Sequence, residues 1–330
     1  MSKPYVIGID MGGTNTVFGI VDARGIVLAS SSIKTGKHSN IVDYIDELHH
    51  EIMRLLEAND AVDKINGIGI GAPNANYFTG MIEENVNLPW PSPIPLAQML
   101  MDKFNIPVAI TNDANAAAIG EMTYGAARGL KDFIMITLGT GVGSGIVING
   151  QVVYGHDGLA GELGHLIVKR NNGRLCGCGR TGCLEAYCSA TGVARTAREF
   201  LEIRTEPSLL RDIPIEQITS KDVYDAAMSG DALANEIFVY TGTILGEALA
   251  DMTVFSSPEA FILFGGLAKS GELLLKPMRQ AMDRSMLACF KGKPKILLSE
   301  LKEADAAVLG ASALGWEAKM PASAASKTEA

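Results

Sequence analysis

The sequence predicts an α/β protein with two domains around a cleft. Apolar segments with the character of strands alternate with amphipathic helical segments along the chain, which is typical of layered α/β folds. A glycine-rich strand–loop–strand unit occurs near the start and again near the middle of the chain. The 330 residues are enough for two domains, each with a core of its own.

The two glycine-rich units share one pattern. In the first, an apolar strand leads into the loop Asp10–Asn15 and a second strand follows. In the second, a strand leads into the loop Leu138–Gly145, and an Asn-Gly hairpin turn follows the next strand. We interpret the pair as an internal duplication of a β-hairpin nucleotide cradle, one per domain, with two unrelated glycine-rich turns as the alternative.

The helices and strands are predicted from periodicity. Apolar residues at steps of three and four predict an amphipathic helix over residues 41–57. The same reasoning predicts helices at 115–124, 191–203, 232–255, 271–286 and 305–317, and buried strands at 66–70, 108–111, 260–264 and 295–298. Residues 318–330 are small, polar and unpatterned, so a disordered tail is expected there.

Composition and charge exclude several classes of function. With 47% hydrophobic residues, 20% charged residues and a formal charge of −9, a soluble globular protein is expected, and a nucleic-acid or anionic-membrane partner is not. The first residues carry no secretory signal pattern, and charges or glycines interrupt every apolar stretch of membrane-spanning length. The five cysteines are an odd number, which does not fit a disulfide framework. We therefore predict a cytoplasmic protein.

The glycine loops are suited to phosphate. Gly12, Gly13 and Thr14 follow a buried strand, where backbone N–H groups can converge on phosphate oxygens, and Asp10 is placed to reach Mg²⁺ through water. Thr140 and the glycines around it would add hydroxyl and amide hydrogen-bond donors to the phosphate from the opposite side. A strand rather than a helix follows the second loop, and neither loop ends in Gly-Lys-Ser/Thr, so the dinucleotide-binding and Walker motifs are not matched.

Four residues in the middle of the chain have the character of a metal site. His165, Cys176, Cys178 and Cys183 lie within 19 residues in a glycine-rich segment. Three thiolates and one imidazole form a tetrahedral set suited to zinc, and a filled set leaves no open position, so the site is predicted to be structural. A redox motif is the alternative, but no Cys-x-x-Cys pair is present. Cys188 and Cys289 are expected to be buried small hydrophobic residues.

Several carboxylates are placed where they could act on a substrate. Asn112 and Asp113 follow a predicted strand and precede a helix of small residues, so Asp113 is either a cleft residue or a helix N-cap. Glu162 and Glu185 flank the predicted metal ligands. Carboxylates held beside a phosphate cradle indicate a polyhydroxylated substrate.

These motifs resemble the ROK family of bacterial sugar kinases. The most specific match is Glu162-Leu-Gly-His165 followed by the segment Cys176–Glu185, and the likeness extends from about Val6 to Trp316. The resemblance implies an actin-like ATPase (ribonuclease H-like) fold whose domains close over ATP and a hexose. The domains implied are 1–113 with 305–317, and a larger zinc-bearing domain of 114–304.

The resemblance also implies roles for single residues. Asp113 would be the general base on the sugar hydroxyl. The expected sugar contacts are Asn74, Asn87, Asn112, Asp113, Glu162, His165 and Glu185; the expected ATP and Mg²⁺ contacts are Asp10, Gly12, Gly13, Thr14, Asn15, Thr140, Gly141, Gly265 and Gly266. His165 would also bind zinc.

The branch of the family is suggested by one segment. Residues 85–90, Asn-Val-Asn-Leu-Pro-Trp, look most like the glucokinases, although Asn74 stands where those usually have glycine. N-acetylhexosamine, mannose and fructose kinases are the alternatives, and a dimer or tetramer is implied. The family also contains repressors with a helix-turn-helix ahead of the phosphate loop, which is not expected here because that loop begins at Asp10. A sugar-binding module without catalysis would have lost the base or the phosphate loop, and this sequence keeps both.

Overall fold

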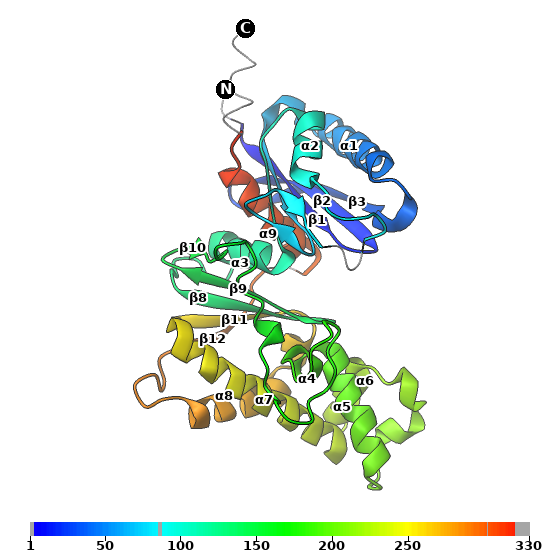
Figure 1. Cartoon of the computed structure of the whole chain (residues 1–330), viewed down its shortest axis with the longest axis vertical. Coiled ribbons are helices and arrows are strands. Elements are labelled where there is room, and N and C mark those ends of the chain that lie inside the picture. The colour runs from blue at the N-terminus through cyan, green and yellow to red at the C-terminus, as the bar shows by residue number, and fades with distance from the viewer. Residues whose placement is uncertain (1–2, 85–87, 302, 321–330) are drawn as a thin grey trace. The chain divides into compact units, whose positions relative to one another are not determined.

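A computed structural model covers the whole chain and describes residues 3–84, 88–301 and 303–320. The chain divides into two compact units (Figure 1). The first unit comprises Met1–Leu130, Gly150–Ala160 and Glu300–Ala330, and the second comprises Lys131–Asn149 and Gly161–Ser299. Both are mixed α/β layers, as expected of the actin-like ATPase fold.

The first unit is built on a mixed sheet. Its strands run in the order β3-β2-β1-β4-β7, where β1 pairs antiparallel with β2 and parallel with β4, and β4 pairs parallel with β7. Their bounds are β1 Tyr5–Met11, β2 Asn15–Asp22, β3 Val27–Lys34, β4 Ile65–Gly71 and β7 Val108–Thr111. The β1–β2 part is the strand–loop–strand unit that the sequence predicts, and β3 continues it into a three-stranded meander.

Helices cover both faces of this sheet. Side chains of α1 (Ile41–Ala58) and α2 (Leu96–Phe104) pack with Ile7, Ile9 and Phe18 in one core. On the other face α9 (Glu303–Glu317) packs on β1, β4 and α3 (Asp113–Tyr124), and Val308 joins Val6 and Val21 in a second core. The shorter elements of this unit are β5 Ala75–Asn76, β6 Met81–Ile82, β10 Gln151–Val152, η1 Thr35–Lys37 and η2 Val62–Lys64.

Two glycines allow α9 to lie close to the sheet. Gly8 and Gly69 are register partners on β1 and β4. A Cβ at Gly8 would lie 2.1 Å from the carbonyl oxygen of Val308, and one at Gly69 would lie 1.9 Å from that of Ala311. Any side chain at either position would therefore push the helix away from the sheet.

The second unit carries the second glycine-cornered hairpin. Its strands run in the order β9-β8-β11-β12, with β8 and β9 antiparallel and β8, β11 and β12 parallel. The strand bounds are β8 Phe133–Leu138, β9 Val142–Ile148, β11 Ala260–Phe264 and β12 Lys295–Leu298. The helices are α4 Glu185–Cys188, α5 Ala190–Ile203, α6 Ser220–Met228, α7 Ala232–Ser256 and α8 Glu272–Ser285, with short turns η3 Leu163–His165, η4 Leu209–Asp212, η5 Ile215–Gln217 and η6 Leu267–Ser270.

Helix α7 is the central helix of this unit. It packs closely on α8, since a Cβ at Gly246 would lie 2.1 Å from the carbonyl oxygen of Met278. Among the described residues it is the one helix long and apolar enough to cross a membrane, but 67% of its most apolar window is buried, as expected of a core helix.

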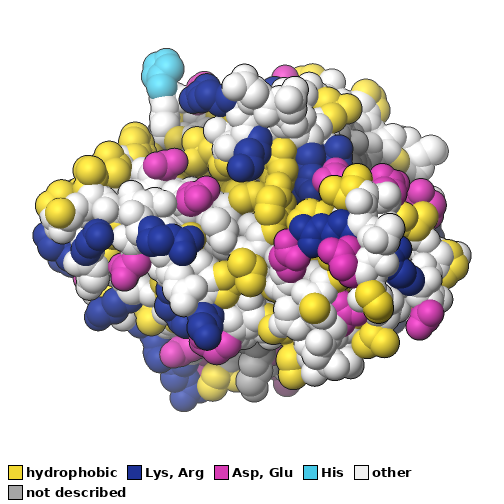
Figure 2. Space-filling model, turned by 90° about the horizontal axis from the view of Figure 1, so that it is seen from below, with side chains coloured by type: hydrophobic (Ala, Val, Ile, Leu, Met, Phe, Trp, Pro, Cys, Tyr) yellow, Lys and Arg dark blue, Asp and Glu magenta, His cyan; other side chains and the backbone are white. Residues whose placement is uncertain are grey.

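On the face in Figure 2, acidic and basic side chains are interspersed, so that face carries mixed charge.

The division of the chain differs from the expected one in its boundary. The sequence-based boundary at residue 113 would place α3 with the second unit, but the first unit extends to Leu130 and also includes residues 150–160. The reason is packing: α3 lies against α9, and a Cβ at Gly120 would lie 2.7 Å from the Cα of Gly310. Helix α9 belongs to the first unit. Residues 321–330 of the expected tail lie outside the described residues.

Candidate active site and metal centre

Two acidic residues lie at one edge of the first sheet. Asp10 near the end of β1, Gly71 at the end of β4 and Thr111 at the end of β7 are register partners, and Asp113 follows two residues later. A Cβ on Gly71 would lie 3.7 Å from the Cα of Asp113 and 3.9 Å from Oδ1 of Asp10. Gly71 therefore lies between the two acidic residues and leaves the space between them unfilled.

Both carboxyls are harder to ionise than usual. Burial, followed by the charge of Asp113, raises the pKa of Asp10 from 3.8 to about 6. The Asp113 side chain is exposed, but the protein atoms around its carboxyl still raise its pKa, against hydrogen bonds from backbone N–H groups, including that of Ala114 at 2.8 Å. Two neighbouring carboxyls of raised pKa on one sheet edge are typical of sites that hold a cation or move a proton.

Asn112 rather than Asp113 caps helix α3. Its side-chain oxygen accepts a hydrogen bond from the backbone N–H of Asn115 at 2.7 Å, and its backbone is extended. Asp113 begins the helix, so the N-cap interpretation of this aspartate is wrong. Its carboxylate is left available for chemistry at the sheet edge.

The first glycine loop is a tight turn between β1 and β2. The Gly12 N–H donates to the Asn15 carbonyl at 3.0 Å, and the Thr35 hydroxyl donates to the Gly12 carbonyl at 2.7 Å. Thr14 and Asn15 are exposed, and Gly12 and Gly13 are half-buried. The loop is thus fixed from one side by η1 and presents its tip to solvent.

The second glycine loop is fixed by the start of two helices. The Val142 N–H donates to Oε2 of Glu185 at 3.0 Å, and the Thr191 hydroxyl donates to the Thr140 carbonyl at 2.8 Å. A Cβ on Gly141 would lie 2.4 Å from Oε2 of Glu185, so a larger residue here would displace this carboxylate from its place beside the loop. The Thr140 side chain is exposed.

The glycine pair after β11 lies beside the beginning of this loop. Strands β8 and β11 are parallel and end together, with Phe264 opposite Thr137. Gly265 has φ +101°, and a Cβ there would lie 2.5 Å from the carbonyl oxygen of Leu138. Gly266 faces open space. The two segments assigned to ATP in this unit therefore lie at one sheet edge.

The four predicted metal ligands come together in the second unit. One ligand atom from each of His165, Cys176, Cys178 and Cys183 lies within 4.8 Å of all the others. The Cys178 and Cys183 sulfurs are 3.7 Å apart, and the Cys176 sulfur is 3.7 Å from Nδ1 of His165. A tetrahedral zinc ion with Zn–S bonds of about 2.3 Å and a Zn–N bond of about 2.0 Å needs sulfurs about 3.8 Å apart and sulfur–nitrogen distances of about 3.6 Å. The donor set fits zinc in identity, and these two distances fit it in spacing.

Glu185 joins the cysteine cluster to the second glycine loop. Its Oε1 lies 3.4 Å from the Cys176 sulfur, while its Oε2 accepts from the Val142 N–H. Gly164, beside His165, would place a Cβ 1.9 Å from the carbonyl oxygen of Val142, so η3 also packs directly on this loop. Glu162 is exposed at the N-terminus of η3.

The remaining predicted site residues lie apart from these clusters or outside the described chain. Asn74 has φ +54°, is exposed, and donates its side-chain amide to the Glu84 carbonyl at 2.8 Å. Asn87 lies outside the described residues. Asp10 and Asp113 belong to the first unit, whereas Glu162, His165 and Glu185 belong to the second.

Sequence reasoning missed Gly71 and Arg174. Arg174, two residues before Cys176, is buried; its guanidinium donates to Glu199 at 2.6 Å and to the Ala186 carbonyl at 3.0 Å, and its backbone N–H donates to the Tyr187 hydroxyl at 2.8 Å. An arginine in a polar, glycine-rich segment has no local signal of burial. Cys289, expected to be buried, is exposed, whereas Cys188 is buried as expected.

Comparisons with known proteins agree on one family. The sequence profile of the ROK family matches residues 6–318. A protein named glucokinase from Halalkalibacterium halodurans is 37% identical over 97% of this chain and 96% of its own length. A solved structure of a ROK family glucokinase from Streptomyces griseus, in complex with glucose and AMPPNP, is 32% identical with a TM-score of 0.76, and covers 95% of this chain and 99% of that one.

A relative with a different function is also similar. A protein named xylose repressor from Caldicellulosiruptor bescii is 30% identical over 94% of this chain and 77% of its own length. The relatives of this chain therefore include both catalytic and regulatory proteins, and sequence similarity alone does not separate the two classes.

Proposed function

Because the chain belongs to the ROK family, we propose that it is an ATP-dependent hexose kinase that transfers the γ-phosphoryl group to the 6-hydroxyl of glucose. The glucokinases among its relatives and the glucose and AMPPNP complex of the Streptomyces griseus protein support this choice. N-acetylhexosamine, mannose and fructose are the alternative acceptors. We further propose a cytoplasmic dimer or tetramer.

The observation that carries the proposal is the place of Asp113. It follows the end of β7, its side chain is exposed, the surrounding protein atoms raise its pKa, and Asn112 caps the helix in its stead. In phosphoryl transfer the attacking hydroxyl must lose its proton, and a carboxylate of raised pKa is a better acceptor for it. Asp113 takes this proton while the hydroxyl attacks in line.

The phosphates and the sugar are assigned to the remaining residues. Gly12, Gly13, Thr14 and Asn15 hold phosphate oxygens from the first unit, Thr140 and Gly141 hold them from the second, and Gly265 and Gly266 receive the adenosine. Asp10 would hold Mg²⁺ through water, and that ion supplies neutralisation of the phosphate charge. Asn74, Asn87, Asn112, Glu162, His165 and Glu185 bind the sugar hydroxyls.

Zinc has a structural role in this proposal. His165, Cys176, Cys178 and Cys183 would complete its tetrahedral set, which leaves no position for an activated water. A bound zinc ion would fix the orientation of His165, whose ring would also face the sugar. Glu185, two residues after Cys183, is held by the same knuckle.

An ATP-depletion assay over a panel of hexoses tests the proposal, with Asp113→Asn as the diagnostic variant. Asparagine keeps the size of the side chain but removes its basicity, so turnover should fall at least ~10²-fold in a folded protein. Asp63→Asn, an exposed aspartate of the same unit, is the matched control and should keep full activity. Near-normal turnover of folded Asp113→Asn would remove the assignment. A repressor or a non-catalytic binder would bind the sugar without consuming ATP.

A further inference from the structure

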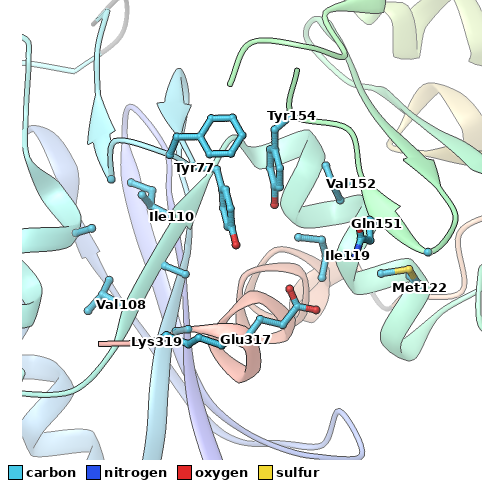
Figure 3. Close-up of a pocket in the computed structure, with 16 residues that line it drawn as sticks. Tyr77, Val108, Ile110, Ile119, Met122, Gln151, Val152, Tyr154, Glu317 and Lys319 are labelled. Atoms are coloured by element: carbon cyan, nitrogen blue, oxygen red, sulfur yellow. The ribbon is translucent and has the colours of Figure 1, made fainter. Parts of the chain in front are cut away.

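A pocket of about 850 Å³ in the first unit is not used by the proposed reaction. All of its lining residues belong to that unit, including side chains of edge strand β7, helix α3 and the end of α9 (Figure 3). Val108, Ile110, Ile119 and Val152 give it an apolar floor. Its volume lies within the range of small-molecule sites, roughly 300–1,000 Å³.

A rigid aromatic stack forms one wall of this pocket. The rings of Tyr77 and Tyr154 are parallel to within 4°, with centroids 4.2 Å apart, and Phe78 packs edge-on against both. Figure 3 shows the two tyrosine hydroxyls directed into the pocket, toward the side on which the Glu317 carboxylate lies. Burial, with a smaller effect of the nearby charges, raises the pKa of Tyr154, so its hydroxyl stays protonated and can donate.

The polar groups of the lining are mixed and close to neutral in sum. Among the lining residues that the structure describes, Glu317 supplies the acidic and Lys319 the basic side chain, and Gln151 adds an amide. A phosphorylated ligand would need an excess of basic groups, and an organic cation would need an excess of acidic ones. The pocket therefore favours a neutral ligand that both donates and accepts hydrogen bonds.

We propose that this pocket is a second small-molecule site, which takes a neutral oligosaccharide of two or three pyranose rings. A pyranose ring offers an apolar C–H face, which packs on aromatic rings, and a rim of hydroxyls, which suits the mixture of phenol, amide, carboxylate and ammonium groups. The size of the pocket exceeds that of one ring. The proposal does not depend on the proposed kinase activity, because no residue assigned to catalysis lines the pocket.

Isothermal titration calorimetry with maltose, maltotriose and cellobiose tests the site, with saturating glucose present so that the site proposed for the hexose is filled. Tyr77→Ala removes half of the stack, and Gln151→Trp, at an exposed position, adds bulk to the pocket without disturbing the core. Phe255→Ala, which removes an aromatic ring that is 77% exposed in the second unit, is the matched control.

We expect millimolar binding of at least one of these sugars, weakened at least ~10-fold by both Tyr77→Ala and Gln151→Trp and unchanged by Phe255→Ala. If Tyr77→Ala does not fold, Gln151→Trp decides alone. The proposal is overturned if none of the three sugars gives heat at about 20 mM, well above a millimolar dissociation constant. It is also overturned if binding survives in both pocket variants, or if the pocket binds a neutral aromatic amide such as nicotinamide and none of the sugars.

Discussion

Replacing Asp10 by asparagine should stabilise the first unit at neutral pH while removing a group that the proposed reaction needs. The pKa of Asp10 is about 6 in the folded chain, against 3.8 when unperturbed. Each pKa unit corresponds to about 1.4 kcal/mol, so ionised Asp10 costs the folded state about 3 kcal/mol. Asparagine carries no charge to desolvate or to repel Asp113, and that cost disappears.

The effect has a defined dependence on pH. The folded state binds the Asp10 proton more tightly than the unfolded state does, so this group reduces the free energy of unfolding as pH rises from about 4 to about 6. Below that window Asp10 is protonated in both states and costs nothing. The stability difference between Asp10→Asn and the wild type should therefore be near zero at pH 3.5 and approach about 3 kcal/mol at pH 8.

Tryptophan fluorescence during urea unfolding measures this difference in the free energy of unfolding, because it reports on the first unit of the chain. Both tryptophans of the chain, Trp90 and Trp316, lie in the first unit, so their emission reports the unfolding of that unit. Asp63→Asn, which removes an exposed carboxylate from the same unit, should change stability by less than about 0.5 kcal/mol at either pH. An Asp10→Asn protein no more stable than wild type at pH 8, or a difference that does not vary with pH, would refute the reasoning.

Three further predictions concern the metal site, the sugar acceptor and the sugar loop. Cys178→Ser should abolish zinc binding in elemental analysis, and activity with it, whereas Cys289→Ser, at the other exposed cysteine, should leave both intact; active protein without zinc, prepared without chelators, would contradict this. Glucose should give the highest kcat/KM in side-by-side kinetics, with N-acetylglucosamine and N-acetylmannosamine at least ~10²-fold poorer; a preference for either acetamido sugar would overturn the choice of glucose and leave the kinase mechanism standing. Asn74→Gly suits the left-handed backbone but loses the hydrogen bond to the Glu84 carbonyl, so the free energy of unfolding should change little. If the Asn74 side chain narrows the sugar loop, its removal should raise kcat/KM for N-acetylglucosamine relative to that for glucose. An unchanged ratio would show that Asn74 does not narrow the sugar loop.

Local features of the structure were predictable from the sequence. Strands such as β1 and β11 are short apolar runs, and helix α1 shows its buried face at steps of three and four, so neighbouring residues alone identify them. The four metal ligands were found for the same reason, because their chemistry and close spacing are visible without the fold. Asp113 became a candidate through its place after a predicted strand and through the carboxylates Glu162 and Glu185, and its role as the base was implied by the resemblance to the family.

Features that depend on distant packing were not predictable. The boundary near Leu130 depends on the contact of Gly120 with Gly310, which are 190 positions apart in the chain. Burial of Arg174 depends on Glu199 and on carbonyl groups of helices that begin after it in the sequence. The wall of Tyr77 and Tyr154 joins two segments that carry no common motif. In each case the deciding interaction lies outside any window of local periodicity.

Glu185 connects the predicted zinc ligands to the second glycine loop. One oxygen of this carboxylate lies 3.4 Å from the Cys176 sulfur, and the other accepts a hydrogen bond from Val142 in the second glycine loop. Removal of a metal from this site would free Cys176 and His165, and with them two of the supports of that loop, since Gly164 packs on the Val142 carbonyl and Glu185 lies beside Cys176. A zinc ion at this site would therefore order the loop assigned to ATP as well as the segment assigned to the sugar. The inactive Cys178→Ser protein should therefore bind both ATP and glucose more weakly, whereas a loss of binding confined to glucose would show that Glu185 holds the glycine loop without help from the metal.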